Sequence, residues 1–198
     1  MRKLFTAAVL VALMTGCTSW TEEEISLIGS SDGIMSVLTI ENQSDSLFLR
    51  QSSADLKKAD LEGETYAVLS ERMAKTLSDP ELGGVGLAGP QVGILRRVVA
   101  VQRFDKEGDP IEVYPNVRII SFKGDKEPGP EGCLSVPDGF VQCLDGKRGM
   151  VERYHDIDIE YWSPAEGKMV VETVQGFTAV IFQHECDHLD GKLFIDYL

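Results

Sequence analysis

The sequence is short of positive charge. Its 198 residues include 19 lysines and arginines against 32 aspartates and glutamates, which gives a formal net charge of -13. Such a chain repels the phosphates of nucleic acids, so we expect no general nucleic-acid binding. Internal repeats and low-complexity tracts are absent as well. The length is sufficient for one domain with a real core and short for two, and we therefore expect a single globular domain.

Long apolar runs are absent except near the N-terminus, where Leu4–Met14 follows two basic residues. This run is too short to span a bilayer and is typical of an export signal. It ends in MTGC, which resembles a bacterial lipobox, in which the cysteine becomes the lipidated first residue of the mature protein. We therefore predict a signal peptide over residues 1–17, a lipid anchor at Cys17, a location in the cell envelope, and membrane contact through that anchor alone. The alternative is a hydrophobic extension on a cytoplasmic protein.

Acidic residues dominate the stretch that follows Cys17, beginning with Glu22–Glu24. Charge of this density favours a solvated segment over a packed one. We therefore predict an acidic tether over residues 18–36 and the globular domain over residues 37–198.

Cysteine is scarce, with four residues at positions 17, 133, 143 and 186. If Cys17 carries a lipid, an odd number of thiols remains, and they cannot all pair. A disulfide framework is therefore not expected, and at least one thiol is expected to have another task.

Hydrophobic periodicity predicts a helix over Gly63–Leu77, which Asp79-Pro80 would end. Strands are predicted at 96–104, 111–122, 153–162 and 169–177, and residues 36–40 fit either a short strand or the start of the domain. The segment Lys123–Gly139 is rich in turn residues and is predicted to be a loop throughout. A buried helix over Thr178–Gly191 follows. Strands first and a buried helix last predict an α+β domain with mainly antiparallel sheet.

The last predicted helix carries QHECDH, in which His184 and His188 are four residues apart. A helix places both imidazoles on one face, one turn apart, where they suit Zn²⁺ or Fe²⁺. Glu185 is then positioned to act on metal-bound water rather than to bind the metal. A charged helix face without metal is the alternative. It is disfavoured because the apolar Thr178–Phe182 comes directly before, and charges in a buried region need partners.

The third metal ligand is expected upstream of this helix. One protease family continues HExxHxxGxxH, but Phe194 stands where its last histidine would be, and another takes a glutamate from a later helix, for which ten residues leave no room. Cys133 lies in a turn-rich loop and can reach a helix, and with two histidines and water it would complete a four-coordinate site. Cys143 is a rival that geometry does not exclude. Cys186 would face away from the two histidines.

Three segments in this order resemble the peptide deformylases: GVGLAGPQ (Gly84–Gln91), EGCLS (Glu131–Ser135) and QHECDH (Gln183–His188). The resemblance runs from about residue 37 to the C-terminus. It implies antiparallel sheets surrounding a central C-terminal helix that carries the HExxH motif.

The resemblance also implies a role for each matched residue. The metal ligands would be Cys133, His184 and His188, with Glu185 as general acid/base. The Gln91 side chain and the backbone N–H of Leu134 would bind the developing oxyanion. Residues placed to bind substrate, with an apolar pocket for a methionine side chain, are Val85, Gly86, Phe177, Val180 and Ile181, although an apolar stripe there also fits plain core. Gln183 would support the site, and Glu131 would pair with Arg153.

The implied reaction is removal of the formyl group from N-formylmethionyl peptides. Metal-bound hydroxide would attack the formyl carbon, and Glu185 would take a proton and return it to the leaving amine. The implied metal is Fe²⁺, which Zn²⁺, Ni²⁺ or Co²⁺ can replace, and we expect a monomer. Two alternatives are an exported metallopeptidase and a metal-binding lipoprotein without catalysis.

The sequence departs from the family pattern in three ways. Gly89 replaces the commoner alanine, which we expect to loosen the loop that holds Gln91. Residues 138–147 form an insertion, predicted to be a flap beside the substrate through Phe140 or Leu144. The export signal is the third departure, because nascent chains are deformylated in the cytosol. An exported enzyme would act on formyl or other N-acyl peptides outside the cytoplasm, and would carry Zn²⁺ because thiolate-bound Fe²⁺ is prone to oxidation.

Overall fold

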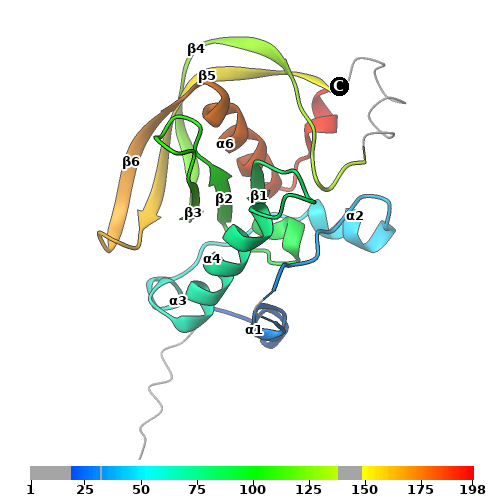
Figure 1. The fold of residues 1–198 in the computed structure, drawn as a ribbon, viewed down its shortest axis with the longest axis vertical. Helices are drawn as coiled ribbons and strands as arrows, with labels where there is room; N and C mark the ends of the chain where they lie inside the picture. Colours follow the sequence, from blue (N-terminus) through cyan, green and yellow to red (C-terminus); the bar gives the residue numbers. More distant parts are fainter. Residues whose placement is uncertain (1–18, 32, 138–148) are drawn as a thin grey trace, which may run out of the picture.

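The computed structural model describes residues 19–31, 33–137 and 149–198 (Figure 1). Helices come first: α1 (Glu22–Gly29), α2 (Gln43–Leu49), α3 (Lys58–Leu61) and α4 (Glu64–Leu77). Strand β1 (Gly86–Ala88) leads into the 3-10 helix η1 (Gly89–Val92), followed by β2 (Val98–Gln102), β3 (Ile111–Pro115), β4 (Arg118–Pro130), β5 (Met150–Ser163) and β6 (Lys168–Gln175). Helix α6 (Gly176–Leu189) and the 3-10 helix η2 (Phe194–Tyr197) close the chain.

Within the described ranges, the strands form two antiparallel three-stranded sheets, ordered β1-β2-β3 and β4-β5-β6. Helix α6 packs against strands of both sheets, and Figure 1 shows it enclosed between them. All but a few of its side chains are buried, as expected for a helix with apolar residues on every side. The prediction of an α+β domain with antiparallel sheets around a helix that carries HExxH is confirmed.

Strand β2 separates two hydrophobic clusters. Successive side chains of a strand point to opposite faces. Val98 and Ala100 therefore belong to the cluster beneath α4, while Val99 and Val101 belong to the cluster around Phe182 of α6. A strand covered on both faces reads as a continuous apolar run, which is why the VVAV stretch predicts β2 so clearly.

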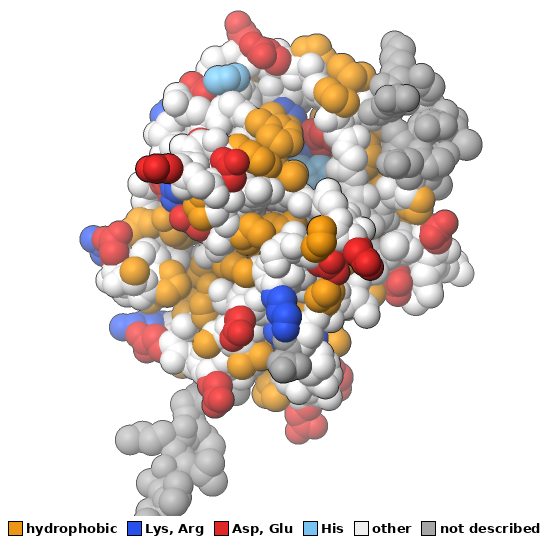
Figure 2. All heavy atoms as spheres, viewed as in Figure 1, with side chains coloured by type: hydrophobic (Ala, Val, Ile, Leu, Met, Phe, Trp, Pro, Cys, Tyr) orange, Lys and Arg blue, Asp and Glu red, His pale blue; other side chains and the backbone are white. Residues whose placement is uncertain are grey.

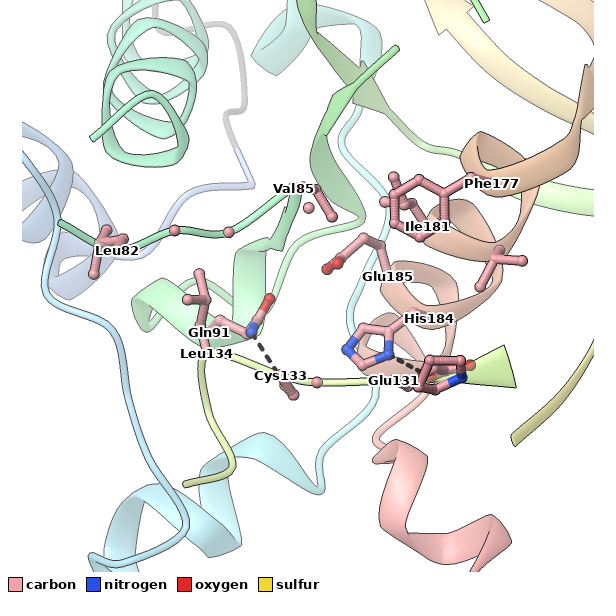
Figure 3. Close-up of a pocket in the computed structure, with 16 residues that line it drawn as sticks. Leu82, Val85, Gln91, Glu131, Cys133, Leu134, Phe177, Ile181, His184 and Glu185 are labelled. Carbon is pink, nitrogen blue, oxygen red and sulfur yellow. Dashed lines mark hydrogen bonds and ion pairs between the residues drawn. The ribbon is translucent and has the colours of Figure 1, made fainter. Parts of the chain in front are cut away.

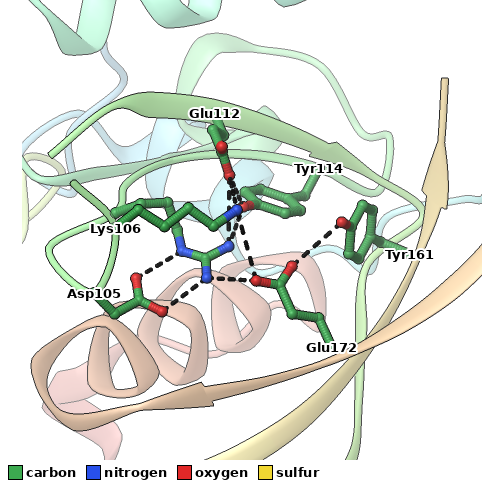
Figure 4. A network of polar contacts seen from close by, with 7 residues as sticks. Asp105, Lys106, Glu112, Tyr114, Tyr161 and Glu172 are labelled. Atoms are coloured by element: carbon green, nitrogen blue, oxygen red, sulfur yellow. Dashed lines mark hydrogen bonds and ion pairs between the residues drawn. The ribbon is translucent and has the colours of Figure 1, made fainter. Parts of the chain in front are cut away.

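A buried arginine ties the two sheets together beside α6 (Figure 4). Arg103 follows β2 and has 1% of its surface exposed. Its guanidinium donates to Asp105 at 2.8 and 2.7 Å and to Glu172 on β6 at 2.6 Å, and it bonds the hydroxyl of Tyr114 on β3. Burial alone would raise the pKa of Glu172, but the bond from Arg103 holds it below its usual value. Because a buried charge needs partners, this network fixes the position of β6 relative to β2.

The predicted loop at Lys123–Gly139 is wrong for its first half. Strand β4 continues to Pro130 and pairs with β5 along its whole length, with register shifts between Ile119 and Ser121 and between Lys123 and Lys126. Gly124 takes a φ of +75° within the second shift. Bulges and edge positions tolerate glycine and proline, so the pairing partner overrides a composition that is typical of turns.

The predicted acidic tether is also wrong for the residues that the structure describes. Thr21 caps helix α1 in a capping box with Glu24, so the acidic residues lie at the end of the helix that favours negative charge. Trp20, Ile28 and Met35 are buried in the cluster beneath α4. The segment is therefore an integral part of the domain.

The sequence predictions for α4 and for residues 36–40 have different outcomes. The helix predicted from Gly63 is α4, with Gly63 as its N-cap. Residues 36–40 belong to neither sheet and to no helix. Three predictions lie outside the described residues: the lipid anchor at Cys17, the rival ligand Cys143 and the flap at 138–147. None of the helices in the described ranges is both long and apolar enough to cross a bilayer.

Candidate active site

Helix α6 and the loop after β4 bring three metal-binding side chains together. His184 and His188 lie one turn apart on α6, and Cys133 lies in the loop, where the Val136 N–H donates to the Cys133 carbonyl at 3.0 Å. The Cys133 sulfur is 3.2 Å from Nε2 of His188, and one ligand atom from each residue lies within 4.8 Å of the other two. Donors that share a tetrahedral ion are about 3.5 Å apart, so the triangle fits one metal ion.

The ring orientation of His184 is set by a buried carboxylate. Nδ1 of His184 lies 2.8 Å from Glu131, and Arg153 on β5 donates to the same carboxylate at 2.6 and 3.1 Å. Burial alone would raise the pKa of Glu131, but its bonds with His184 and Arg153 hold it below its usual value. Arg153 also donates to Asp187 on α6 at 2.6 Å. The expected Glu131–Arg153 pair is thus present, and Nε2 of His184 is left for a metal.

Glu185 is buried beside the three ligands with 3% of its surface exposed. Burial raises the pKa of its carboxyl to about 7, a range in which a group can both accept and return a proton. Its Oε2 has no hydrogen-bond partner among the described residues. A buried polar atom without a partner is expected to bind water, substrate or an ion, so this orphan fits a hydrolytic metal site.

Gln91 is held at both ends of its amide. Its Oε1 accepts from the Ala88 N–H at 2.8 Å, and its Nε2 donates to the Ser135 hydroxyl at 3.2 Å and lies 3.7 Å from the Cys133 sulfur. The backbone N–H of Leu134 donates to no other described residue. Figure 3 shows Gln91, Cys133, His184 and Glu185 directed into one space. Two N–H donors thus lie beside the metal ligands, as an oxyanion site requires.

The space is a cavity of about 410 Å³ that opens between β1, the Cys133 loop and α6 (Figure 3). The residues predicted to bind substrate all line it: Val85, Gly86, Phe177, Val180 and Ile181. Phe177 is 55% exposed and contacts Phe104, with ring centroids 5.4 Å apart, so it belongs to the mouth of the cavity and not to the core. His188 has 1% of its surface exposed and is absent from the lining.

Gly86 permits the close approach of β1 to helix α6. A Cβ atom on Gly86 would lie 2.2 Å from Oε1 of Glu185 and 2.8 Å from Ile181. Real Cβ atoms do not make such contacts, so only glycine fits without displacing the carboxylate.

Gly89 tightens the turn before Gln91, so the expectation that it loosens this turn is wrong. A Cβ atom on Gly89 would lie 2.7 Å from the carbonyl oxygens of both Ile94 and Arg96. Both neighbours are backbone atoms, and the turn would have to open to admit a methyl group. Glycine therefore allows η1 to pack closely on the chain that follows it.

Several contacts in the site could not be predicted from the sequence. Ser135 binds Gln91, and Asp187 binds Arg153, although both residues lie inside the matched motifs. Gln183, expected to support the site, bonds the backbone N–H and carbonyl of Tyr154 at 3.0 and 2.7 Å. Cys186 packs in the core, where burial raises the pKa of its thiol to about 12, and it does not approach the ligand triangle.

Comparisons with known proteins agree with this geometry. Residues 34–198 match the sequence profile of the family described as polypeptide deformylase. The chain belongs to this family. It is 41% identical over 163 residues to a peptide deformylase of Desulforudis audaxviator. The match covers 82% of this chain and 94% of that protein.

Solved structures show the same likeness. A class I type b peptide deformylase of Acinetobacter baumannii is 33% identical, with a TM-score of 0.68. It has been solved with actinonin, where the match covers 83% of this chain and 97% of that one, and with Met-Ala-Ser, where it covers 83% and 98%. The fold and the Cys-His-His ligand set of this chain therefore agree with its membership of a metal-dependent family.

We predict that Cys133→Ser abolishes stoichiometric metal binding, because a hydroxyl replaces the thiolate in a set of three protein ligands. Cys186→Ala is the matched control, since Cys186 lies one residue from Glu185 but outside the triangle. Elemental analysis of the purified proteins measures the metal. A chelator should lower the unfolding temperature of the unmodified protein and of Cys186→Ala only. Metal at a concentration 100-fold above its Kd adds about 2.7 kcal/mol to the free energy of unfolding. Equal metal content in both variants would contradict this ligand set.

Proposed function

We propose that this protein hydrolyses the formyl group from N-formylmethionyl peptides and releases formate. The observation that carries the proposal is the cavity that holds Cys133, His184, Glu185 and the Gln91 amide together in a chain of the polypeptide deformylase family. The bound peptide of the Acinetobacter baumannii relative begins with methionine, which supports a methionine side chain as the occupant of the apolar part.

The residues divide the chemistry among them. A divalent cation held by Cys133, His184 and His188 would polarise the formyl carbonyl and lower the pKa of a bound water. Glu185, with a carboxyl that titrates near neutrality, accepts the proton of the attacking water and returns it to the leaving amine. The amide of Gln91 stabilises the charge that develops on the formyl oxygen, together with the backbone N–H of Leu134. Such a donor contributes about 3–4 kcal/mol to the transition state.

The apolar wall binds the methionine side chain. Val85 approaches from the loop before β1, and Phe177, Val180 and Ile181 approach from the first turns of α6. Burying a methionine side chain there stabilises the complex by about 1.5–3 kcal/mol and places the formyl group at the polar end of the cavity.

The metal and the location of the protein complete the proposal. We propose Fe²⁺ as the metal, by likeness to the family pattern, with Zn²⁺ in an oxidising compartment because a thiolate beside Fe²⁺ is easily oxidised. A lipid anchor at Cys17 and a location in the cell envelope follow from the lipobox-like sequence. The substrates would then be formyl or other N-acyl peptides outside the cytoplasm, and the enzyme would act as a monomer.

Activity is tested with formyl-Met-Ala-Ser and its unformylated counterpart on protein loaded with Fe²⁺ or Zn²⁺. We expect formate release from the formylated peptide only. Glu185→Gln should lower kcat by about 10²–10⁴-fold with the metal content unchanged, because it removes the proton acceptor. Cleavage of the unformylated peptide would favour a metallopeptidase, and metal binding without turnover would favour a binding module.

Gly86→Ala tests the packing of Glu185. The added methyl group displaces the carboxylate, and a displacement of about 1 Å lowers kcat by about 100-fold. Gly129→Ala on β4 is the control, since a Cβ atom there meets nothing within 4 Å. Formate release and metal content are measured for both. An unchanged kcat in Gly86→Ala would mean that Glu185 does not act from the observed position.

The anchor is tested by expressing the full chain and Cys17→Ser in a bacterial host, followed by fractionation and mass spectrometry of the N-terminus. We expect the unmodified protein in the membrane fraction, beginning at a lipidated Cys17, and the variant outside that fraction. An intact Met1 in the soluble fraction of the unmodified protein would refute the anchor.

A further inference from the structure

The stretch Met35–Ile40, here called the strap, contacts both segments that supply the oxyanion donors. The Leu38 N–H donates to the Gln91 carbonyl at 2.8 Å, and the Ile40 N–H donates to the Ser135 carbonyl at 2.9 Å. These two bonds connect the strap to two segments that lie far apart in the sequence. The intervening Thr39 N–H bonds none of the described residues.

The two bonds hold the backbone on either side of the proposed transition-state contacts. Gln91 carries one donor in its side chain, and Ser135 directly follows Leu134, whose N–H is the other donor. Apart from the strap, Gln91 Nε2 joins η1 to the Cys133 loop through the Ser135 hydroxyl at 3.2 Å and the Cys133 sulfur at 3.7 Å. The strap adds a backbone connection to each segment, and the distance between the two donors then depends on it.

The strap is itself held by helix α4. Arg72 is 4% exposed, and its guanidinium donates to two carbonyls at the end of α1, at 2.7 and 2.8 Å, and to the Gly33 carbonyl at 3.2 Å. The Met35 N–H then donates to the Thr76 hydroxyl at 2.9 Å. The residues that lead into the strap are thus hydrogen-bonded to side chains of α4.

The other end of α1 is bound to the chain that follows η1. Arg96 donates to Glu24 at 2.8 and 2.6 Å, and both side chains of this pair are largely buried. The same guanidinium bonds the Ser19 carbonyl and lies 5.3 Å from the centre of the Trp20 ring. The family profile begins at residue 34, so Ser19–Ser31 lies outside the matched region, and Arg96 binds it to the chain that follows the Gln91 turn.

We infer that residues 19–31 and 33–40 form a positioning element that sets the two oxyanion donors of the active site. No residue of this element touches the reacting atoms, and its effect passes through the Gln91 and Ser135 carbonyls. The inference rests on the proposed deformylation, in which these donors meet charge that develops only in the transition state. Loss of the strap bonds should therefore lower kcat and leave KM unchanged.

The test compares Leu38→Pro with Thr39→Pro in the full, metal-loaded chain. Proline at 38 removes the N–H that binds Gln91, while proline at 39 removes an N–H without a described partner. We expect kcat on formyl-Met-Ala-Ser to fall about tenfold or more in Leu38→Pro, with KM and metal content unchanged. Thr39→Pro should match the unmodified protein. Rates are measured well below the unfolding temperature of each protein.

Amide hydrogen exchange provides a readout that does not need activity. Exchange at Ile40 and Val136, whose N–H groups donate to the Ser135 and Cys133 carbonyls, should be faster in Leu38→Pro than in Thr39→Pro. Equal exchange and equal kcat in the two variants would overturn the inference, as would an equal loss in both. An unmodified chain that does not release formate counts against the proposed function, while the exchange result still decides the positioning role.

A milder variant covers the case in which Leu38→Pro fails to fold. Arg72→Lys keeps the charge but loses the forked geometry that holds three carbonyls at once. It should lower kcat and speed exchange at Ile40 and Val136. Arg118→Lys, in an exposed pair with Asp55, is its control and should change neither.

Discussion

The carboxylate of Glu131 is the shared acceptor on which the geometry of the site depends. It bonds Arg153 on β5 and His184 on α6, so it joins the second sheet to the central helix. An isolated buried carboxylate would be strongly unfavourable, and here two donors cover it. Because Glu131 is two residues from Cys133, the bonds that orient His184 also fix the loop that carries the thiol. One acceptor thereby sets the relative position of ligands from two distant segments.

Much of the fold could be predicted because its hydrophobic periods are clear. The buried runs of β2 and α6 and the helical spacing of α4 have no competing interpretation. The second part of β4, residues 123–130, differs from the prediction because its glycines, prolines and charges are typical of loops, and only the long partner β5 makes it a strand. Helix α1 differs from the prediction because its acidic residues, considered by composition alone, favour a solvated tether. The Thr21-to-Glu24 spacing is a capping-box signal that could have indicated a helix.

The candidate site was easier to predict from the sequence than the fold, because its residues lie in three short motifs. The helical spacing of His184 and His188 predicts two metal ligands. The third ligand was not found after them, which pointed to an upstream thiol. The supporting contacts could not be read in the same way. Gln91 meets Ser135 across 44 residues, and Arg153 meets Asp187 across 34. Pairings at such separations leave no periodic trace in one sequence, and the contact between Gly86 and Glu185 depends on the packing of a strand on a helix.

The separation of the metal ligands along the chain has a consequence for the choice of metal. Cys133 and His188 are 55 residues apart, with β5, β6 and most of α6 between them. An unfolded chain would have to close that loop against its entropy before both could bind one ion. Tight binding therefore follows folding of the second sheet. The ion that enters is then chosen from those available where folding finishes, since affinity alone does not favour Fe²⁺ over later metals of the series.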